Sequence, residues 1–318
     1  MELKALTIDP RRLWPGEVAY DGPLAFVDLA AVADWPEAVA LPPCPVVGLG
    51  PRDHPSAPLL DAVIEAPVSA ETLARQVLAR PEAAAVVAQL LRVLPSLGVE
   101  HGLTVESLAY GLLQGSAAHR AWIAGRTASA EVAAPGAVRV ERSAGRLTIT
   151  LDRPQAGNAI DLAIRDALHD AFALAALDPG IEAIALRGAG RTFSLGAELA
   201  EFGTTADPAT AHAIRARTLP ARMIARCAER LEVHVQGGCV GAGLEMAAWS
   251  RRITATSDAW FQLPELAMGV LPGAGGCVSL VRRIGRQRAA LLILSGRRIG
   301  ARTALEWGLV DAVVEAPA

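Results

Sequence analysis

Two segments of the chain combine a strand-like apolar pattern with a glycine-rich turn and then a helical pattern. The first, GRTFSLGAELAEF (190–202), follows the apolar run IEAIALRGAG (181–190); the second is LEVHVQGGCVGAGLEMAAW (231–249). Strands and helices that alternate along a chain are typical of layered α/β domains. We therefore predict such a domain, with helices beginning at Gly196 and near Gly243.

The segments before these turns agree with that architecture. VRVERSAGRLTITLDRP (138–154) alternates apolar and polar residues around Ala144 and Gly145, which predicts a β-hairpin. A helix is expected from Asp161 to Leu177.

The N-terminal half has a different texture. The apolar runs 23–31 and 44–50 are bounded by Pro and Gly and predict short strands, whereas 81–94 and 104–115 have helical spacing, as does a segment that starts at Ser69. TASAEVAAPG (127–136) has the composition of a linker. We predict a small α/β region over 1–66, a helical segment over 67–130 and an α/β core over 136–318.

Composition argues against several kinds of partner. A net charge of -3 gives no excess of basic residues for binding nucleic acid. No apolar stretch of about 18 residues is free of charges, so no membrane partner is expected, and the N-terminus lacks the apolar region of a signal peptide. Cys44, Cys227, Cys239 and Cys277 lack metal-ligand spacing, which predicts buried thiols, no metal site and a cytoplasmic location.

The two glycine-rich turns are the first candidates for chemistry. The first N–H groups of a helix have no intrahelical acceptor, so two such turns side by side are able to hold an oxyanion. The alternative is that the glycines only allow tight turning and packing. Neither turn has a dinucleotide-binding or P-loop pattern.

Two glutamates follow the second turn. Glu245 is expected in the first turn of a helix, where the helix dipole favours the ionised form, and Glu265 follows Pro264 in an apolar segment that disfavours charge. Two carboxyl groups in unlike environments suit a base and an acid at neutral pH. Taken singly, each has the alternative of a helix cap or a solvated surface group.

Other polar residues have weaker patterns. His234 lies on a strand and is interpreted as a core or interface residue, with catalysis as the alternative; Ser194 has no identifiable triad partners. A second group lies on the expected helix between the turns and is interpreted either as a solvated face or as a reader of an acyl carboxylate: His212, Arg215, Arg217 and Arg222.

Four ordered motifs resemble the crotonase (enoyl-CoA hydratase/isomerase) superfamily: FSLGAEL, QGGCVGAGLEMA, QLPELAMGVLPGAGG and SGRRIGARTALEWGLVDAVV. The resemblance covers about 138–314 and includes LDRPQAGNAI (151–160), which is similar to the family's early CoA-contacting segment. It implies a crotonase-like layered ββα spiral core, here preceded by an N-terminal α/β-plus-helical region.

The resemblance also implies an activity and its residues. The backbone N–H groups of Ala197 and Ala242 would hold a thioester oxygen, while Glu245 and Glu265 would hold the water that adds across the α,β double bond. The implied substrate is an acyl-CoA thioester, with no cofactor beyond the coenzyme A it carries, and the implied assembly is a homo-oligomer, a trimer or hexamer. Further substrate-binding residues are implied at Asn158, Ala159, Gly196, Gly241, Pro264 and Gly273.

Alternative functions stay open at this point. They are another crotonase reaction, namely isomerisation, thioester hydrolysis, decarboxylation or dioxygenation, and a non-catalytic CoA-binding scaffold. Three positions depart from the family pattern: Glu198 stands where Asp is frequent, Ala242 replaces a glycine and Arg251 replaces an Asp.

One heptad is nearly repeated. DAVIEAP occupies 61–67 and DAVVEAP occupies 311–317. Family members normally continue past the second heptad into helices, and 67–126 resembles that C-terminal helical segment. We interpret 67–126 as this segment displaced to the N-terminal side, and 1–66 as a shrunken remnant of a preceding core. The alternative is an unrelated α/β domain whose heptad matches by accident.

Overall fold

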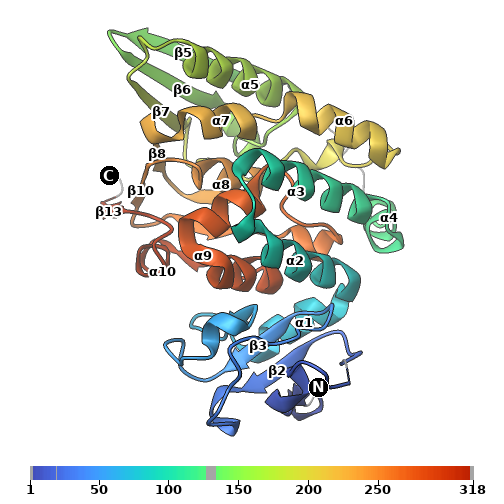
Figure 1. Cartoon of the computed structure of the whole chain (residues 1–318). Helices are drawn as coiled ribbons and strands as arrows, with labels where there is room; N and C mark the ends of the chain where they lie inside the picture. The colour runs from blue at the N-terminus through green and yellow to red at the C-terminus, as the bar shows by residue number, and fades with distance from the viewer. Residues whose placement is uncertain (1–2, 19, 127–133, 316–318) are drawn as a thin grey trace.

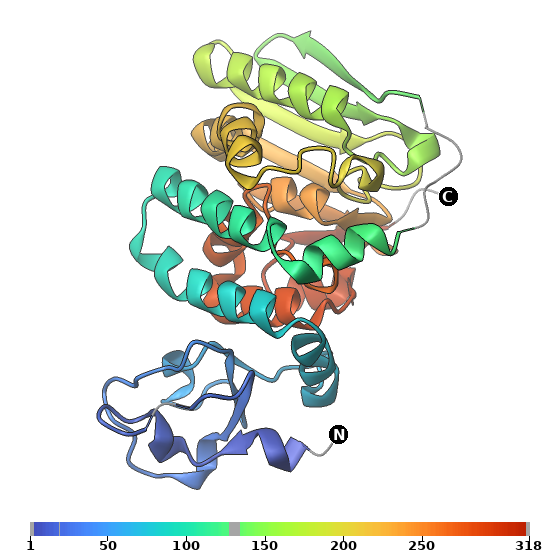
Figure 2. The same ribbon diagram turned by 90° about the vertical axis from the view of Figure 1, so that its right-hand side faces the viewer.

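The computed structural model describes residues 3–18, 20–126 and 134–315. A small N-terminal sheet lies at one end of the molecule and the large sheet at the other, with helices α2 (Pro81–Val93) and α3 (Val99–Gln114) between them (Figures 1 and 2). Most of the predicted linker, residues 127–133, lies outside the described residues.

The large sheet has the strand order β13-β10-β8-β7-β6-β5. Its neighbours pair in parallel except for β5 and β6, which form the predicted hairpin around Ala144, a residue with φ 50°. In β6 buried and partly exposed residues alternate, as expected for a strand with one face on the core. The strands are β5 (Ala137–Ser143), β6 (Arg146–Asp152), β7 (Ala183–Gly188), β8 (Leu231–Val235), β10 (Arg252–Thr256) and β13 (Ala312–Val314).

A second, smaller sheet contains the strand that leads into the second glycine-rich turn. Its order is β12-β11-β9, formed by β9 (Gly238–Val240), β11 (Trp260–Gln262) and β12 (Ile299–Gly300). The helices of this core are α5 (Leu162–Leu177), α6 (Pro208–Thr218), α7 (Ala221–Cys227), α8 (Ala242–Ala247), α9 (Gly276–Ser295), which is interrupted at Gly285, and α10 (Ala301–Glu306). The layered α/β prediction is confirmed.

One local prediction is wrong. The segment after Gly196 forms only a short 3-10 helix, Leu199–Glu201, instead of an α-helix. Glu198 caps this turn, since its side chain accepts a hydrogen bond from the Ala200 N–H, and the chain then runs through an irregular segment to α6. The helix predicted near Gly243 begins at Ala242.

Residues 3–18 and 20–63 contain a separate parallel sheet with its own core. Its strands, in spatial order, are β1 (Thr7–Ile8), β2 (Ala25–Asp28), β3 (Val46–Leu49) and β4 (Ala62–Val63). Leu13, Leu29 and Val46 are fully buried in this core. The predicted strands at 23–31 and 44–50 are confirmed in shortened form.

Four helices follow: α1 (Ala70–Ala79), α2 (Pro81–Val93), α3 (Val99–Gln114) and α4 (Ala117–Ala124). The Ser69 hydroxyl accepts a hydrogen bond from the Thr72 N–H at 3.2 Å and so caps α1, as the sequence predicts. Leu73, Val77 and Val87 are fully buried and belong to the same hydrophobic cluster as the large sheet. Burying each such side chain stabilises the packing by about 1.5–3 kcal/mol, so the helices are an integral part of the core's interior.

Candidate active site

Two turns lie side by side and build one wall of a cavity. The Ser194 N–H donates to the Gly238 carbonyl at 3.1 Å, and the Val240 N–H donates to the Ser194 carbonyl at 2.9 Å. These bonds hold the turn after residue 193 against the end of β9, so the two glycine-rich turns predicted from the sequence do meet.

Left-handed backbone shapes both turns. Gly196 has φ 93° and Gly241 has φ 48°, a region that residues with a Cβ rarely adopt. A Cβ on Gly241 would also come within 2.7 Å of the Glu265 Oε1. The residues after these glycines, Ala197 and Ala242, line the cavity, and neither N–H donates a hydrogen bond to any residue that the structure describes. Two residues whose amides have no partner among the described residues therefore line one cavity.

Glu245 lies on α8, but its carboxylate reaches the start of α9. Its Oε2 accepts hydrogen bonds from the N–H groups of Ala274 at 2.6 Å and Gly276 at 2.8 Å. The side chain is buried, and burial raises its pKa to about 7 although the two amides favour the ionised form. The expectation that a helix terminus keeps Glu245 readily ionised is wrong in direction, because desolvation outweighs the amides.

Glu265 begins the 3-10 helix Glu265–Met268. Its Oε2 is buried and has no hydrogen-bond partner among the described residues. Burial, followed by the charge of Glu245, raises its pKa well above the usual range, in agreement with the predicted apolar setting. An unpaired buried carboxyl oxygen is costly unless a ligand or water uses it.

A third carboxyl group, which sequence reasoning missed, comes from α3. Glu106 is 1% exposed, and it accepts hydrogen bonds from the N–H groups of Gly275 at 2.7 Å and Val278 at 3.1 Å. Burial, and after it the charge of Glu245, raises its pKa. Glu106 and Glu245 thus share the first turn of α9, and the N-terminal helices complete the site's support.

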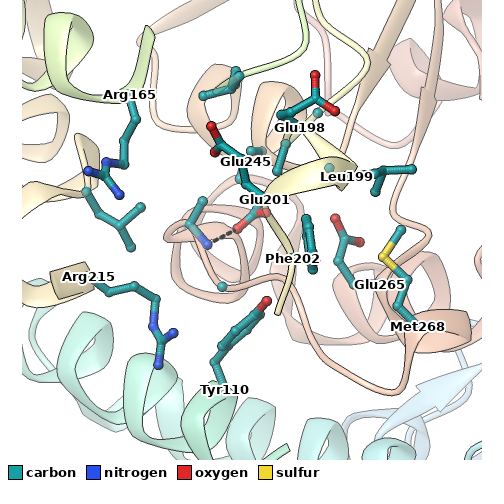
Figure 3. Close-up of a pocket in the computed structure, with 18 of the residues that line it drawn as sticks. Tyr110, Arg165, Glu198, Leu199, Glu201, Phe202, Arg215, Glu245, Glu265 and Met268 are labelled. Carbon is teal, nitrogen blue, oxygen red and sulfur yellow. Dashed lines mark hydrogen bonds between the residues drawn. The ribbon is translucent and has the colours of Figure 1, made fainter. Parts of the chain in front are cut away.

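The cavity between these elements has a volume of about 270 Å³. Figure 3 shows that it is bordered by Tyr110 of α3 on one side and by Glu265 and Met268 on another, with Arg165 and Arg215 facing it from α5 and α6. Tyr110 and Gln114 were not predicted. Their only signal was the spacing of four residues that they share with Glu106, which places the three on one helix face.

The other implied contact residues divide into two groups. Gly196, Gly241, Pro264 and Gly273 line the cavity, whereas Asn158 and Ala159 are not among its lining residues. The Asn158 amide is used within the fold: its Nδ2 donates to the Ala189 and Thr192 carbonyls at 2.8 and 2.7 Å. A substrate contact through the Asn158 side chain is therefore not supported.

The remaining candidates have structural partners. Ser194 is buried and its hydroxyl donates to the Asn158 carbonyl. His234 lies on β8 away from the cavity and shares a hydrogen bond with the Thr254 hydroxyl. Arg251, at a departure from the family pattern, pairs with Glu232 at 2.7 Å.

The polar group of α6 and α7 faces α3 instead of open solvent. His212 and Arg215 both contact Ser107, and Arg222 pairs with Glu100. The interpretation of these side chains as a solvated face is wrong for these three, because α3 packs over them.

Three further predictions concern what the chain lacks. The four cysteines are buried and free, as predicted. Within 3–18, 20–126 and 134–315, no group of three His, Cys, Asp or Glu side chains is arranged to hold a metal ion. No helix in these ranges is long and apolar enough to cross a bilayer.

Comparisons with known proteins point to one family. The family model described as enoyl-CoA hydratase/isomerase matches residues 141–317. The 2,3-dehydroadipyl-CoA hydratase of Escherichia coli (strain K12) is 37% identical over 174 residues, which are 55% of this chain and 68% of that protein. A probable enoyl-CoA hydratase of Mycobacterium tuberculosis is 36% identical, and the match covers 56% of this chain and 69% of that protein.

Solved structures give the same result. The enoyl-CoA hydratase from Thermoplasma volcanium GSS1 is 35% identical with a TM-score of 0.50, covering 56% of this chain and 72% of that one. An enoyl-CoA hydratase/isomerase from Mycobacterium abscessus is 34% identical with a TM-score of 0.53, and the match covers 56% of this chain and 71% of that one. The chain therefore belongs to the enoyl-CoA hydratase/isomerase family of the crotonase superfamily.

Proposed function

We propose that this protein is an enoyl-CoA hydratase that adds water across the α,β double bond of an acyl-CoA thioester. The observation that carries the proposal is the convergence of two amides and two buried carboxyl groups on one cavity. Among the described residues, neither amide donates a hydrogen bond and one carboxyl oxygen has no partner. The names of its relatives, among them the 2,3-dehydroadipyl-CoA hydratase, support the same reaction.

The proposed chemistry begins at the thioester carbonyl. Its oxygen accepts hydrogen bonds from the N–H groups of Ala197 and Ala242, which are already in place and need no reorganisation when charge develops. Removing one donor of this kind typically costs about 2.7–4 kcal/mol of transition-state stabilisation. The methyl group of Ala242 narrows the site beside the thioester.

Glu245 and Glu265 hold the attacking water between them. As the water oxygen bonds to C3, one carboxylate takes a water proton and the C2–C3 π electrons move to the thioester oxygen as an enolate. The enolate then collapses and C2 takes a proton from the other carboxyl group. Raised pKa values suit both groups to exchanging protons near neutral pH.

We also propose that 67–126 act as the helical cover of this site, in the position of a displaced C-terminal segment, and that 1–66 are a remnant of a preceding core. The contacts of Glu106 with α9 and of Tyr110 with the cavity support this division.

The homo-oligomer and the cytoplasmic location remain predictions.

The test is a hydration assay. We expect loss of the conjugated thioester absorbance when the protein meets crotonyl-CoA or a panel of longer and aromatic enoyl-CoAs, with a 3-hydroxyacyl-CoA as product. Binding of the whole panel without reaction would instead favour a scaffold. A shifted double bond without gain of water would identify an isomerase.

A further inference from the structure

The Tyr110 hydroxyl has no hydrogen-bond partner among the residues that the structure describes. The ring extends from α3, packs against Gly273 and directs its hydroxyl into the cavity (Figure 3). Burial raises the pKa of this phenol, so the group remains a neutral hydrogen-bond donor at any pH near neutrality. It is thus available to a ligand.

Arg215 lies beside the same ring, with its guanidinium carbon 4.6 Å from the ring centroid. The guanidinium donates to the Ser107 hydroxyl at 3.1 Å, to the Ser107 carbonyl at 3.2 Å and to the Gln114 side-chain oxygen at 3.0 Å. Three of its five N–H groups are thereby used. All three acceptors are neutral, and no carboxylate of the described residues lies within 4.0 Å.

Another arginine has charged partners. Arg153 is buried, whereas Arg215 is only partly buried, and the Arg153 guanidinium pairs with Glu198 at 2.8 Å and Asp161 at 3.6 Å. Buried charges in proteins are generally paired in this way, because desolvation of an isolated ion is costly. Burial lowers the pKa of Arg215, while the Tyr110 phenol and the Glu106 carboxyl group of α3 act in the opposite direction. Arg215 lines the cavity, so a bound molecule can supply an anion for it.

On the basis of the proposed hydratase function, we propose that the acyl group carries a carboxylate at the end remote from the thioester. The Arg215 guanidinium and the Tyr110 hydroxyl bind this carboxylate. A carboxylate accepts from both donors, whereas an alkyl end would leave them desolvated and unpaired. Sites built to hydrogen-bond a polar group discriminate strongly against analogues that lack it.

Acidic residues also line the cavity, and they must tolerate this anion. Burial favours the neutral forms of Glu201, Glu245 and Glu265, because it raises the pKa of each. Arg153 pairs with the two other acids, Asp161 and Glu198, and offsets one of their two charges. Repulsion of a substrate carboxylate is therefore reduced.

The first test is binding, measured by calorimetry on the full chain with saturated thioesters. Succinyl-, glutaryl- and adipyl-CoA are compared with butyryl-, valeryl- and hexanoyl-CoA. For at least one length we expect the carboxylated thioester to bind ten times more tightly or better, as a charge-assisted contact implies. Equal or weaker binding of every carboxylated member overturns the proposal.

This outcome is independent of catalysis. Hydration of the matching trans-2-enoyl thioesters is followed in parallel. If none is hydrated, the proposed hydratase function fails while the binding ratio still decides the carboxylate proposal; if only uncharged ones are bound and hydrated, the function stands and the carboxylate proposal fails.

The two tyrosines of the chain give a matched pair of variants. Tyr110→Phe removes a hydroxyl that has no partner in the described part of the chain, so we expect the ratio of the two dissociation constants to fall three- to tenfold with little change in melting temperature. Tyr20→Phe removes a hydroxyl that donates to the Leu24 carbonyl at 3.0 Å, so we expect lower stability and an unchanged ratio. A ratio that survives Tyr110→Phe excludes the hydroxyl as a ligand.

Arg215→Lys tests the guanidinium separately. Lysine keeps the positive charge and loses the planar fork of donors, so we expect the preference for the carboxylated thioester to fall by at least tenfold. Circular dichroism of the variant checks that α3 and α6 remain folded. An unaltered preference in this folded variant also contradicts the proposal.

Discussion

The heptads 61–67 and 311–317 lead into edge strands of two different sheets, and each begins with the same clamp, a pair of hydrogen bonds between an aspartate and the neighbouring strand. Asp61 donates its N–H to the Val46 carbonyl at 3.0 Å, and its Oδ2 accepts from the Val46 N–H at 2.9 Å. Asp311 donates its N–H to the Ile253 carbonyl at 2.9 Å, and its Oδ2 accepts from the Ile253 N–H at 2.7 Å. In each case the aspartate fixes the start of an edge strand, β4 or β13; residues 316 and 317 lie outside the described residues.

The surroundings of the two aspartates differ. The Asp61 side chain is 2% exposed and pairs with Arg92 of α2 at 2.7 Å and with Arg286 of α9 at 3.3 Å. The Asp311 side chain is 42% exposed and pairs with Arg283 of α9. One helix therefore contacts both copies, from either side of its interruption at Gly285.

The same local sequence therefore forms the same hydrogen bonds in both places, whereas tertiary packing sets how deeply the aspartate is buried and how much it stabilises the fold. The two sheets also differ in role. The large sheet leads into the turns and glutamates of the site, while the small sheet is held against α9 through Asp61 and Glu65.

The largest expected effect distinguishes the two glutamates of the cavity from a glutamate beside the small sheet. Glu265→Gln and Glu245→Gln each remove a proposed acid or base, so we expect hydration to fall by about 10²–10⁴-fold with the fold retained. Glu65→Gln, the control, breaks the pair with Arg288 at 2.6 Å outside the site and should leave the rate within about twofold. A normal rate in either site variant would remove that residue from the mechanism.

The next effect compares the two clamps directly. Asp61→Asn leaves Arg92 and Arg286 without their buried anion, for which we expect a loss of about 3 kcal/mol in the free energy of unfolding. Asp311→Asn affects a more exposed pair and should cost about 1 kcal/mol. Urea unfolding of both variants measures the difference, and equal losses would show that burial does not distinguish the copies.

The smallest effect concerns pH. Burial raises the pKa of Glu245 from 4.5 to about 7 and also raises that of Glu106, so the folded state binds more protons than the unfolded state in this range. Their contribution to stability is fully present below pH 4.5 and, for Glu245, is lost as pH rises to about 7. We therefore expect the melting temperature to fall along that interval.

Glu106→Gln sharpens this test. It removes one of the raised groups, so the slope of melting temperature against pH should flatten, and one N–H of the α9 turn loses its acceptor at a cost of about 1–3 kcal/mol. Glu100→Gln changes an exposed carboxylate on the same helix and serves as the control. An identical slope in the two variants would exclude Glu106 from the coupled titration.

Much of the core could be predicted because its signals are local. The hairpin around Ala144, the cap at Ser69 and the two glycine-rich turns depend on neighbouring residues, and the structure has them where the sequence places them. The failure after Gly196 is also physical: Glu198 caps a 3-10 turn and pairs with Arg153, which ends regular structure at a point where spacing alone predicts a helix.

The family, the two glycine-rich turns and the glutamates that follow them could all be inferred from local sequence patterns. The meeting of Glu106 and Tyr110 with this site depends on the folded arrangement, because contacts between α3 and the segment at the start of α9 join residues far apart in the chain, which no local period encodes. The raised pKa of Glu245 also depends on the tertiary structure. Desolvation is set by all the atoms packed around a carboxyl group, whereas the position of a residue on a helix indicates only the effect of the nearest dipole.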